Sequence, residues 1–201
     1  MFNAERPEAQ TNLGGLYESL DRPTEAEAAY RLAIELQPQF LPAYVNLAQL
    51  LAAQKRNREA IALLKAGLAE VPDAALLHHA LGLALVRDGQ AQAALTELGR
   101  AAELAPRNPR YQYVYAVALE ANGRIEAAIA ALEAGLRTSP HDSDLLWALA
   151  DYQRKAGRAT AALRSACRLR QRMPQDPQLT ALLAELRAVT GAKGCPPAAG
   201  E

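Results

Sequence analysis

The sequence predicts an all-α fold, namely a right-handed α-solenoid of five helix-turn-helix units followed by a C-terminal capping helix. Prolines recur at a constant step of 34 residues, at Pro38, Pro72, Pro106, Pro140 and Pro174. A fixed period of this size is the sequence signature of a repeat architecture. Glycines recur at the same step inside the later units, and helix-forming residues dominate while β-branched residues are scarce.

The segment 75–108 is the clearest copy of the unit. A first apolar run contains Leu81 and is interrupted by Gly89, and a second run contains Leu98 and stops at Pro106. Proline lacks the N–H group that would continue a helix, and glycine permits a tight turn. Each unit is therefore expected to be two antiparallel helices. In the other copies, the slot of Gly89 holds Asp21, Lys55, Gly123, Gly157 and Gly191.

The repeat divides the chain into segments of equal length. After a lead-in over 1–6, the predicted units are 7–40, 41–74, 75–108, 109–142 and 143–176. One more helix is predicted over 177–190, where Glu185 and Arg187 interrupt the apolar pattern, as expected of a solvating cap. The start of the array has no comparable cap. The tail 191–201 is rich in glycine and proline without periodicity, so disorder is expected there.

The large and small residues of each unit fall at fixed positions. In the second unit they are Tyr44, Leu47, Ala48, Leu51, Ala60, Leu64, Gly67 and Pro72. This pattern resembles the tetratricopeptide repeat family, which has large residues at unit positions 4, 7, 11 and 24, small ones at 8, 20 and 27, and proline at 32. The resemblance covers roughly 7–191. It implies stacked units that bind partner proteins without catalysis. Gln153 departs from it, because a large apolar residue is expected at that position.

The overall charge identifies no partner, because 22 basic and 22 acidic side chains cancel. The distribution is nevertheless uneven. The segment 7–40 has six acids and two arginines, a balance of −4, whereas 143–176 has three acids and seven basic residues, a balance of +4. Two interpretations stay open: solvated helix faces, or head-to-tail association with a complementary surface.

Several functional classes find no support in the sequence. No apolar run reaches the length of a membrane span, and no signal peptide is visible, so the default expectation is the cytoplasm, or the periplasm if the chain is a fragment of a larger exported protein. Cys167 and Cys195 lack metal-ligand spacing, and no disulfide is expected. His141, beside Asp142 and Ser143, indicates helix capping rather than a catalytic triad. We therefore predict no enzyme, no catalytic or metal site, and no cofactor.

The resemblance implies where a partner would bind. In this family the first helices line a concave groove, with unit positions 2, 5, 9 and 12 directed outward. Position 5 then presents rings in three consecutive units, and aromatic residues beside arginine are common anchors of interfaces. These rings could instead complete the packing between helices, and both alternatives stay open. The implied groove residues are Val45, Asn46, Gln49, Leu76, His79, Leu83, Arg110, Tyr113, Val117, Trp147, Asp151 and Arg154.

The sequence gives less support to other kinds of partner. One subgroup of the family binds the C-terminal carboxylate of chaperone tails through lysine and asparagine, but only Asn46 matches its pattern, so no such binding is expected. The arginine stripe Arg164, Arg168 and Arg172 indicates a solvated face rather than nucleic-acid binding. Two alternatives remain: a docking or regulatory segment of a larger enzyme or multihaem electron-transfer protein, since the texture is similar to the arrays of bacterial multihaem cytochromes, or a module that self-assembles through its N-terminal end.

Overall fold

The computed structural model describes residues 6–195, and all regular secondary structure in that part of the chain is α-helical. The chain divides into two compact units after Leu104. Unit 1 ends with that residue and unit 2 begins with Ala105. The predicted fold class, five helical pairs followed by a single helix, is confirmed. None of the helices within 6–195 is both long and apolar enough to cross a membrane.

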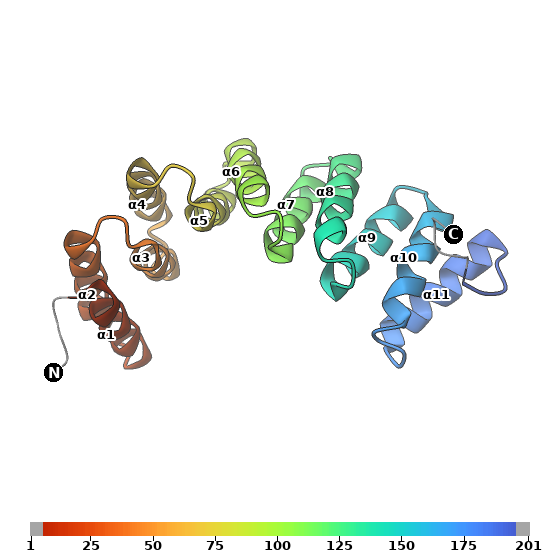
Figure 1. Ribbon diagram of the computed structural model, residues 1–201, viewed down its shortest axis with the longest axis horizontal. Helices are drawn as coiled ribbons and strands as arrows, with labels where there is room; N and C mark the ends of the chain where they lie inside the picture. The colour runs from red at the N-terminus through yellow and green to blue at the C-terminus, as the bar shows by residue number, and fades with distance from the viewer. Residues whose placement is uncertain (1–5, 196–201) are drawn as a thin grey trace. The chain divides into compact units, whose positions relative to one another are not determined.

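Unit 1 contains three antiparallel helical pairs (Figure 1). Within each pair the two helices pack along their length, and the second helix of one pair also contacts the first helix of the next. First helices contact one another as well, α1 with α3 and α3 with α5. The helices are α1 (Pro7–Ser19), α2 (Pro23–Leu36), α3 (Leu41–Ala53), α4 (Asn57–Glu70), α5 (Ala75–Arg87) and α6 (Ala91–Leu104).

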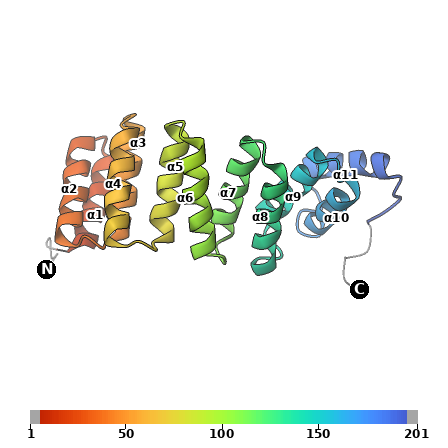
Figure 2. The ribbon, with the colours of Figure 1, turned by 90° about the horizontal axis from the view of Figure 1, so that it is seen from above.

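Unit 2 repeats the arrangement with two pairs and the predicted last helix. Its α9, α10 and α11 lie side by side, α10 packing against both neighbours (Figure 2). The first helices α7 and α9 are also in contact. The helices are α7 (Pro109–Ala121), α8 (Ile125–Thr138), α9 (Ser143–Lys155), α10 (Ala159–Arg170) and α11 (Pro177–Thr190).

The turn slots adopt the backbone that their glycines predict. Gly89 has a φ of 77°, in the left-handed region that glycine enters without steric cost. Asp21 and Lys55 occupy the same slot with φ values of 54° and 63°. A side chain in this region is strained, because its Cβ approaches the following carbonyl. Two of the six turns are therefore built at a conformational cost.

Close helix packing depends on small residues both within a pair and between successive pairs. A Cβ atom added at Gly82 would lie 2.6 Å from the side chain of Leu98 and 3.2 Å from its backbone nitrogen. Helix α5 can therefore approach α6 this closely only because position 82 has no side chain. Gly135 of α8 has a similar role, since its added Cβ would lie 2.9 Å from Leu145 of α9.

Asparagine and aspartate residues begin the first helices of unit 2. The Asp142 side chain accepts a hydrogen bond from the backbone N–H of Leu145 at 2.9 Å, which is the capping predicted for this turn. Asn108 and Asp176 cap α7 and α11 in the same way. These caps satisfy backbone donors that have no partner inside the helix.

The C-terminal segment is tied back to α10 by a disulfide bond. Cys167 of α10 and Cys195 form a disulfide with a Cα–Cα separation of 5.8 Å, so the prediction of no disulfide was wrong. Gly191 ends α11 in the left-handed conformation, and the chain then returns to α10. This return is a tertiary feature that the spacing of 28 residues does not reveal. Residues 191–195 are held by this bond, while the rest of the predicted disordered tail, 196–201, lies outside the described residues.

Candidate functional site

The predicted groove residues all lie on first helices, as their unit positions require. Those of unit 1 are on α3 and α5, and those of unit 2 are on α7 and α9. Because α3 contacts α5 and α7 contacts α9, each unit brings its own predicted residues onto neighbouring helices. We therefore describe two surfaces, one in each unit.

The surface of unit 2 presents two adjacent exposed apolar side chains on α7, although Leu16 and Val86 on first helices of unit 1 are individually more exposed. Tyr113 and Val117 are each 37% exposed, and they lie one turn apart on α7. Trp147 on the adjacent α9 is only partly buried. We call Tyr113, Val117, Trp147, Asp151 and Arg154 the α7–α9 surface. It contains a tyrosine, a tryptophan and an arginine, the residue types that most often contribute the binding energy of protein interfaces.

Charged side chains at this surface form a connected set. The Asp151 carboxylate accepts from Arg154 at 2.8 Å and lies 3.1 Å from Lys155 Nζ. Lys155 also reaches Glu120 of α7 at 2.8 Å, and Arg154 lies 3.5 Å from Glu185 of α11. Burial raises the pKa of Asp151, but the hydrogen bonds from Arg154 and Lys155 outweigh it, and the net shift is downward. Asp151 therefore stays ionised and holds both cations in place.

The sequence did not single out Tyr152, which lies beneath this surface. Its ring is buried beneath the Lys155 ammonium, which lies 5.3 Å from the ring centroid. Burial, with the nearby Glu120 carboxylate, raises the pKa of Tyr152 to about 12. The ion pair between Glu120 and Lys155 joins α7 to α9. It could have been suspected from the sequence, because the two residues have opposite charges and lie about one repeat unit apart.

In unit 1 the predicted groove residues are less accessible. His79 is only 7% exposed, so it belongs to the packing, which was one of the two alternatives for this row of rings. Val45, Asn46, Leu76 and Leu83 are partly buried. Gln49 is exposed. Arg110, the remaining predicted residue, lies in unit 2 at the start of α7 and is exposed.

The neighbouring His78 makes polar contacts within unit 1. Its Nδ1 lies 2.6 Å from the Glu97 carboxylate of α6, and its Nε2 lies 2.9 Å from the Pro72 carbonyl oxygen. Both ring nitrogens thus contact structural groups, and this imidazole joins α5 to α6. Within residues 6–195, no group of three or more histidine, cysteine, aspartate or glutamate side chains is arranged to hold a metal ion.

Comparisons with known proteins add the family context. Two family models described as tetratricopeptide repeat match the chain, one over residues 79–143 and the other over 17–84 and 121–186. The search of curated proteins gives no match.

Three solved structures illustrate the similarity of fold. YrrB, a tetratricopeptide repeat protein with an unusual peptide-binding site, is 22% identical with a TM-score of 0.65, over 91% of this chain and 94% of that one. PilF of Pseudomonas aeruginosa is 20% identical with a TM-score of 0.72, over 92% and 84%. MamA is 17% identical with a TM-score of 0.67, over 94% and 98%. At these identities the likeness shows the fold alone.

Proposed function

The chain belongs to the tetratricopeptide repeat family, and from this premise we propose that it is a non-catalytic scaffold that binds a peptide or helix of a partner protein on its first helices. The general scaffold role follows from the family. The peptide-binding site of YrrB, a protein of the same fold, is in keeping with this role. The principal contact in our proposal is the α7–α9 surface.

The observation that carries this proposal is the exposure of Tyr113 and Val117 beside Trp147. Burying a large apolar side chain is the main source of affinity in a protein interface, and a few aromatic and arginine residues supply most of it. Asp151 and Arg154 supply polar groups at the edge of this apolar area, where they can orient a peptide backbone. Gln49, Leu76 and Leu83 would extend the contact in unit 1, where His79 supports the helices from below the surface.

The test uses peptides selected for binding from a random library displayed on phage, with the full chain as bait. The affinity of a selected peptide is then measured by fluorescence anisotropy. Replacing Tyr113→Ala together with Val117→Ala should weaken binding by about tenfold or more, because the anchoring apolar area is lost. The matched control is Leu32→Ala with Leu36→Ala, on α2, where the side chains are 39% and 41% exposed. Equal binding by all three proteins would contradict the proposal.

A second candidate function is self-association through α1. Leu16 on this helix and Leu20, its C-cap residue, are 54% and 56% exposed, and at the position of Leu16 the second unit has Leu50, which is 6% exposed. The partner in this candidate is a second copy of the chain, whose basic segment 143–176 complements the acidic 7–40. Light scattering over a range of concentrations tests it. Growth in mass that Leu16→Glu abolishes would support it, and a monomer at every concentration would exclude it.

A further inference from the structure

A concave feature of unit 2 lies where the second helices α8 and α10 meet the first helix α9, and neither Tyr113 nor Val117 lines it. It is a cleft of about 950 Å³ lined by residues of α8, α9 and α10, by the turn residues Arg158 and Gln171 and by Cys195. We call it the basic cleft. Five arginines line it, Arg137, Arg158, Arg164, Arg168 and Arg170, against one acid, Glu133.

Three of these arginines are available for a ligand. Arg158 pairs with Glu126, and Arg168 donates to the Pro140 carbonyl oxygen at 2.9 Å. Arg137, Arg164 and Arg170 make no ion pair with any residue of 6–195. A guanidinium presents its donors as a planar fork that matches a carboxylate, and several in one concave site focus a positive potential. The cleft is therefore suited to a group with more than one negative charge.

The floor of the cleft contains a buried polar pair. Gln153 and Ser165 are each 5% exposed, and the Ser165 hydroxyl donates to Gln153 Oε1 at 2.8 Å. The Gln153 amide nitrogen donates no hydrogen bond to another residue of 6–195, although it has two N–H groups. Gln153 is the residue that departs from the repeat pattern, since the other four units have a large apolar residue at position 11. An amide at the edge of a concave site can donate to a carboxylate or a peptide carbonyl.

The other residues that line the cleft favour a peptide over a nucleic acid as the ligand. Leu136 and Leu149 also line the cleft; they are 6% and 3% exposed, so each presents a small apolar area to an aliphatic side chain. No aromatic side chain lines it. Proteins that hold single-stranded nucleic acids stack bases on aromatic rings, so a cleft without them favours a different anion. The volume is within the range of ligand sites.

We propose that the basic cleft binds an acidic peptide segment of a protein, in which carboxylates flank an aliphatic residue. The carboxylates pair with Arg137, Arg164 and Arg170, and the aliphatic side chain contacts Leu136 and Leu149. The Gln153 amide donates to the peptide at the floor. This site is distinct from the α7–α9 surface, so the scaffold would hold two ligands on one unit.

The probe is a short fluorescein-labelled peptide with one leucine between clusters of glutamate, added to the full chain and followed by anisotropy. Arg164→Ala with Arg170→Ala should weaken its binding by about tenfold or more, because two charged hydrogen-bonding partners are lost. Arg87→Ala with Arg107→Ala is the matched control. It removes the same charge from exposed arginines that have no ion pair within 6–195, and binding should change by less than about twofold.

Two further pairs of substitutions test whether the effect belongs to the basic cleft. The charge reversal Arg164→Glu with Arg170→Glu should create binding to the same peptide carrying lysine in place of glutamate, a gain that unfolding cannot imitate. Tyr113→Ala with Val117→Ala should leave binding of the acidic peptide unchanged, which separates this site from the proposed function. Equal losses in the cleft and control variants would overturn the proposal. So would binding of a single-stranded oligonucleotide, or of oligoglutamate without leucine, as tightly as the acidic peptide.

Discussion

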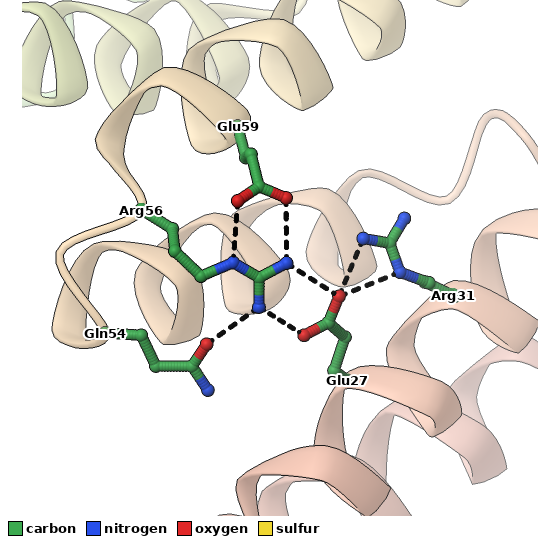
Figure 3. Close-up of polar contacts among 5 residues, drawn as sticks. All are labelled: Glu27, Arg31, Gln54, Arg56 and Glu59. Atoms are coloured by element: carbon green, nitrogen blue, oxygen red, sulfur yellow. Dashed lines mark hydrogen bonds and ion pairs between the residues drawn. The ribbon is translucent and has the colours of Figure 1, made fainter.

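Arg56 joins the first two helical pairs of unit 1 by donating from Nη1 to Glu27 Oε2 at 2.6 Å (Figure 3). Arg56 precedes α4, and Glu27 lies on α2 of the preceding pair. The same guanidinium pairs with Glu59, and Arg31 also donates to Glu27. Side chains from successive repeats thus share one charged network, which supplements the apolar packing between them.

This network predicts a pH-dependent contribution to stability. The hydrogen bond from Arg56 lowers the pKa of Glu27 from its ordinary 4.5, with a further contribution from Arg31, against the opposing effect of partial burial. A carboxyl group with a lowered pKa stabilises the folded state above about pH 4.5, and this stabilisation is lost as the pH falls through the folded value. Glu27→Gln should therefore lower the free energy of unfolding by about 1 kcal/mol at neutral pH.

Urea unfolding at neutral and acidic pH measures this effect. The difference between Glu27→Gln and the unmodified chain should shrink as the pH is lowered below 4.5. Glu35→Gln is the control, because Glu35 is exposed and makes no ion pair within 6–195. A difference for Glu27→Gln that persists unchanged at acidic pH would show that its carboxylate charge is not involved.

The turn at Lys55 offers a route to a more stable chain. Its φ of 63° is unfavourable for a side chain, so Lys55→Gly should raise the free energy of unfolding by about 1 kcal/mol. Asp21→Gly should gain less, because aspartate tolerates this region better than lysine. The reverse change, Gly89→Ala, should destabilise by a similar amount through the backbone alone, since nothing lies within 4 Å of the added Cβ. Urea titration of the three variants measures their free energies of unfolding. A loss of stability in Lys55→Gly would contradict the conclusion that its turn is strained.

Two helical glycines should respond to alanine in opposite directions. At Gly82 the added Cβ would overlap Leu98, so Gly82→Ala should cost about 1–3 kcal/mol despite the better helix propensity of alanine. At Gly15 on α1 the nearest atom is 3.8 Å away, so Gly15→Ala should stabilise by about 0.5–1 kcal/mol. Thermal melts of the pair provide the measurement. A gain in both variants would mean that α5 and α6 are not in close contact at Gly82.

Loss of the disulfide should loosen the end of unit 2 before the rest. Cys195→Ser opens a loop of 28 residues, for which the chain-entropy stabilisation is about 3.5 kcal/mol. Hydrogen exchange should become faster in α11, which packs on α10, while α1 and α2 keep their protection. Unchanged exchange in α11 after Cys195→Ser would show that packing against α10 suffices to hold it.

Much of the fold follows from local signals in the sequence. The prolines at constant spacing place the ends of the second helices, and the residues in the Gly89 slot adopt the left-handed turn. The cap at Asp142 is also local, because its side chain accepts a hydrogen bond from the backbone only three residues later. These features depend on short stretches of chain, so periodicity and residue type are sufficient to predict them.

The candidate sites depend on contacts between helices and were less accessible to prediction. His79 and Tyr113 share a unit position, yet one is 7% exposed and the other 37%, a difference that the unit position does not predict. The Gln153–Ser165 pair explains a residue that the sequence identified only as a departure from the pattern. The disulfide could not be predicted, because no repeat position specifies the path of the chain between α11 and Cys195.

The most direct test of the scaffold function maps where a selected peptide binds. Isotope-labelled full chain is titrated with the peptide, and amide chemical shifts are followed by nuclear magnetic resonance. The proposal predicts the largest shift changes around Tyr113 and Val117 on α7 and around Trp147 and Asp151 on α9. Changes confined to α8 and α10, or to unit 1, with none on α7 and α9, would contradict it.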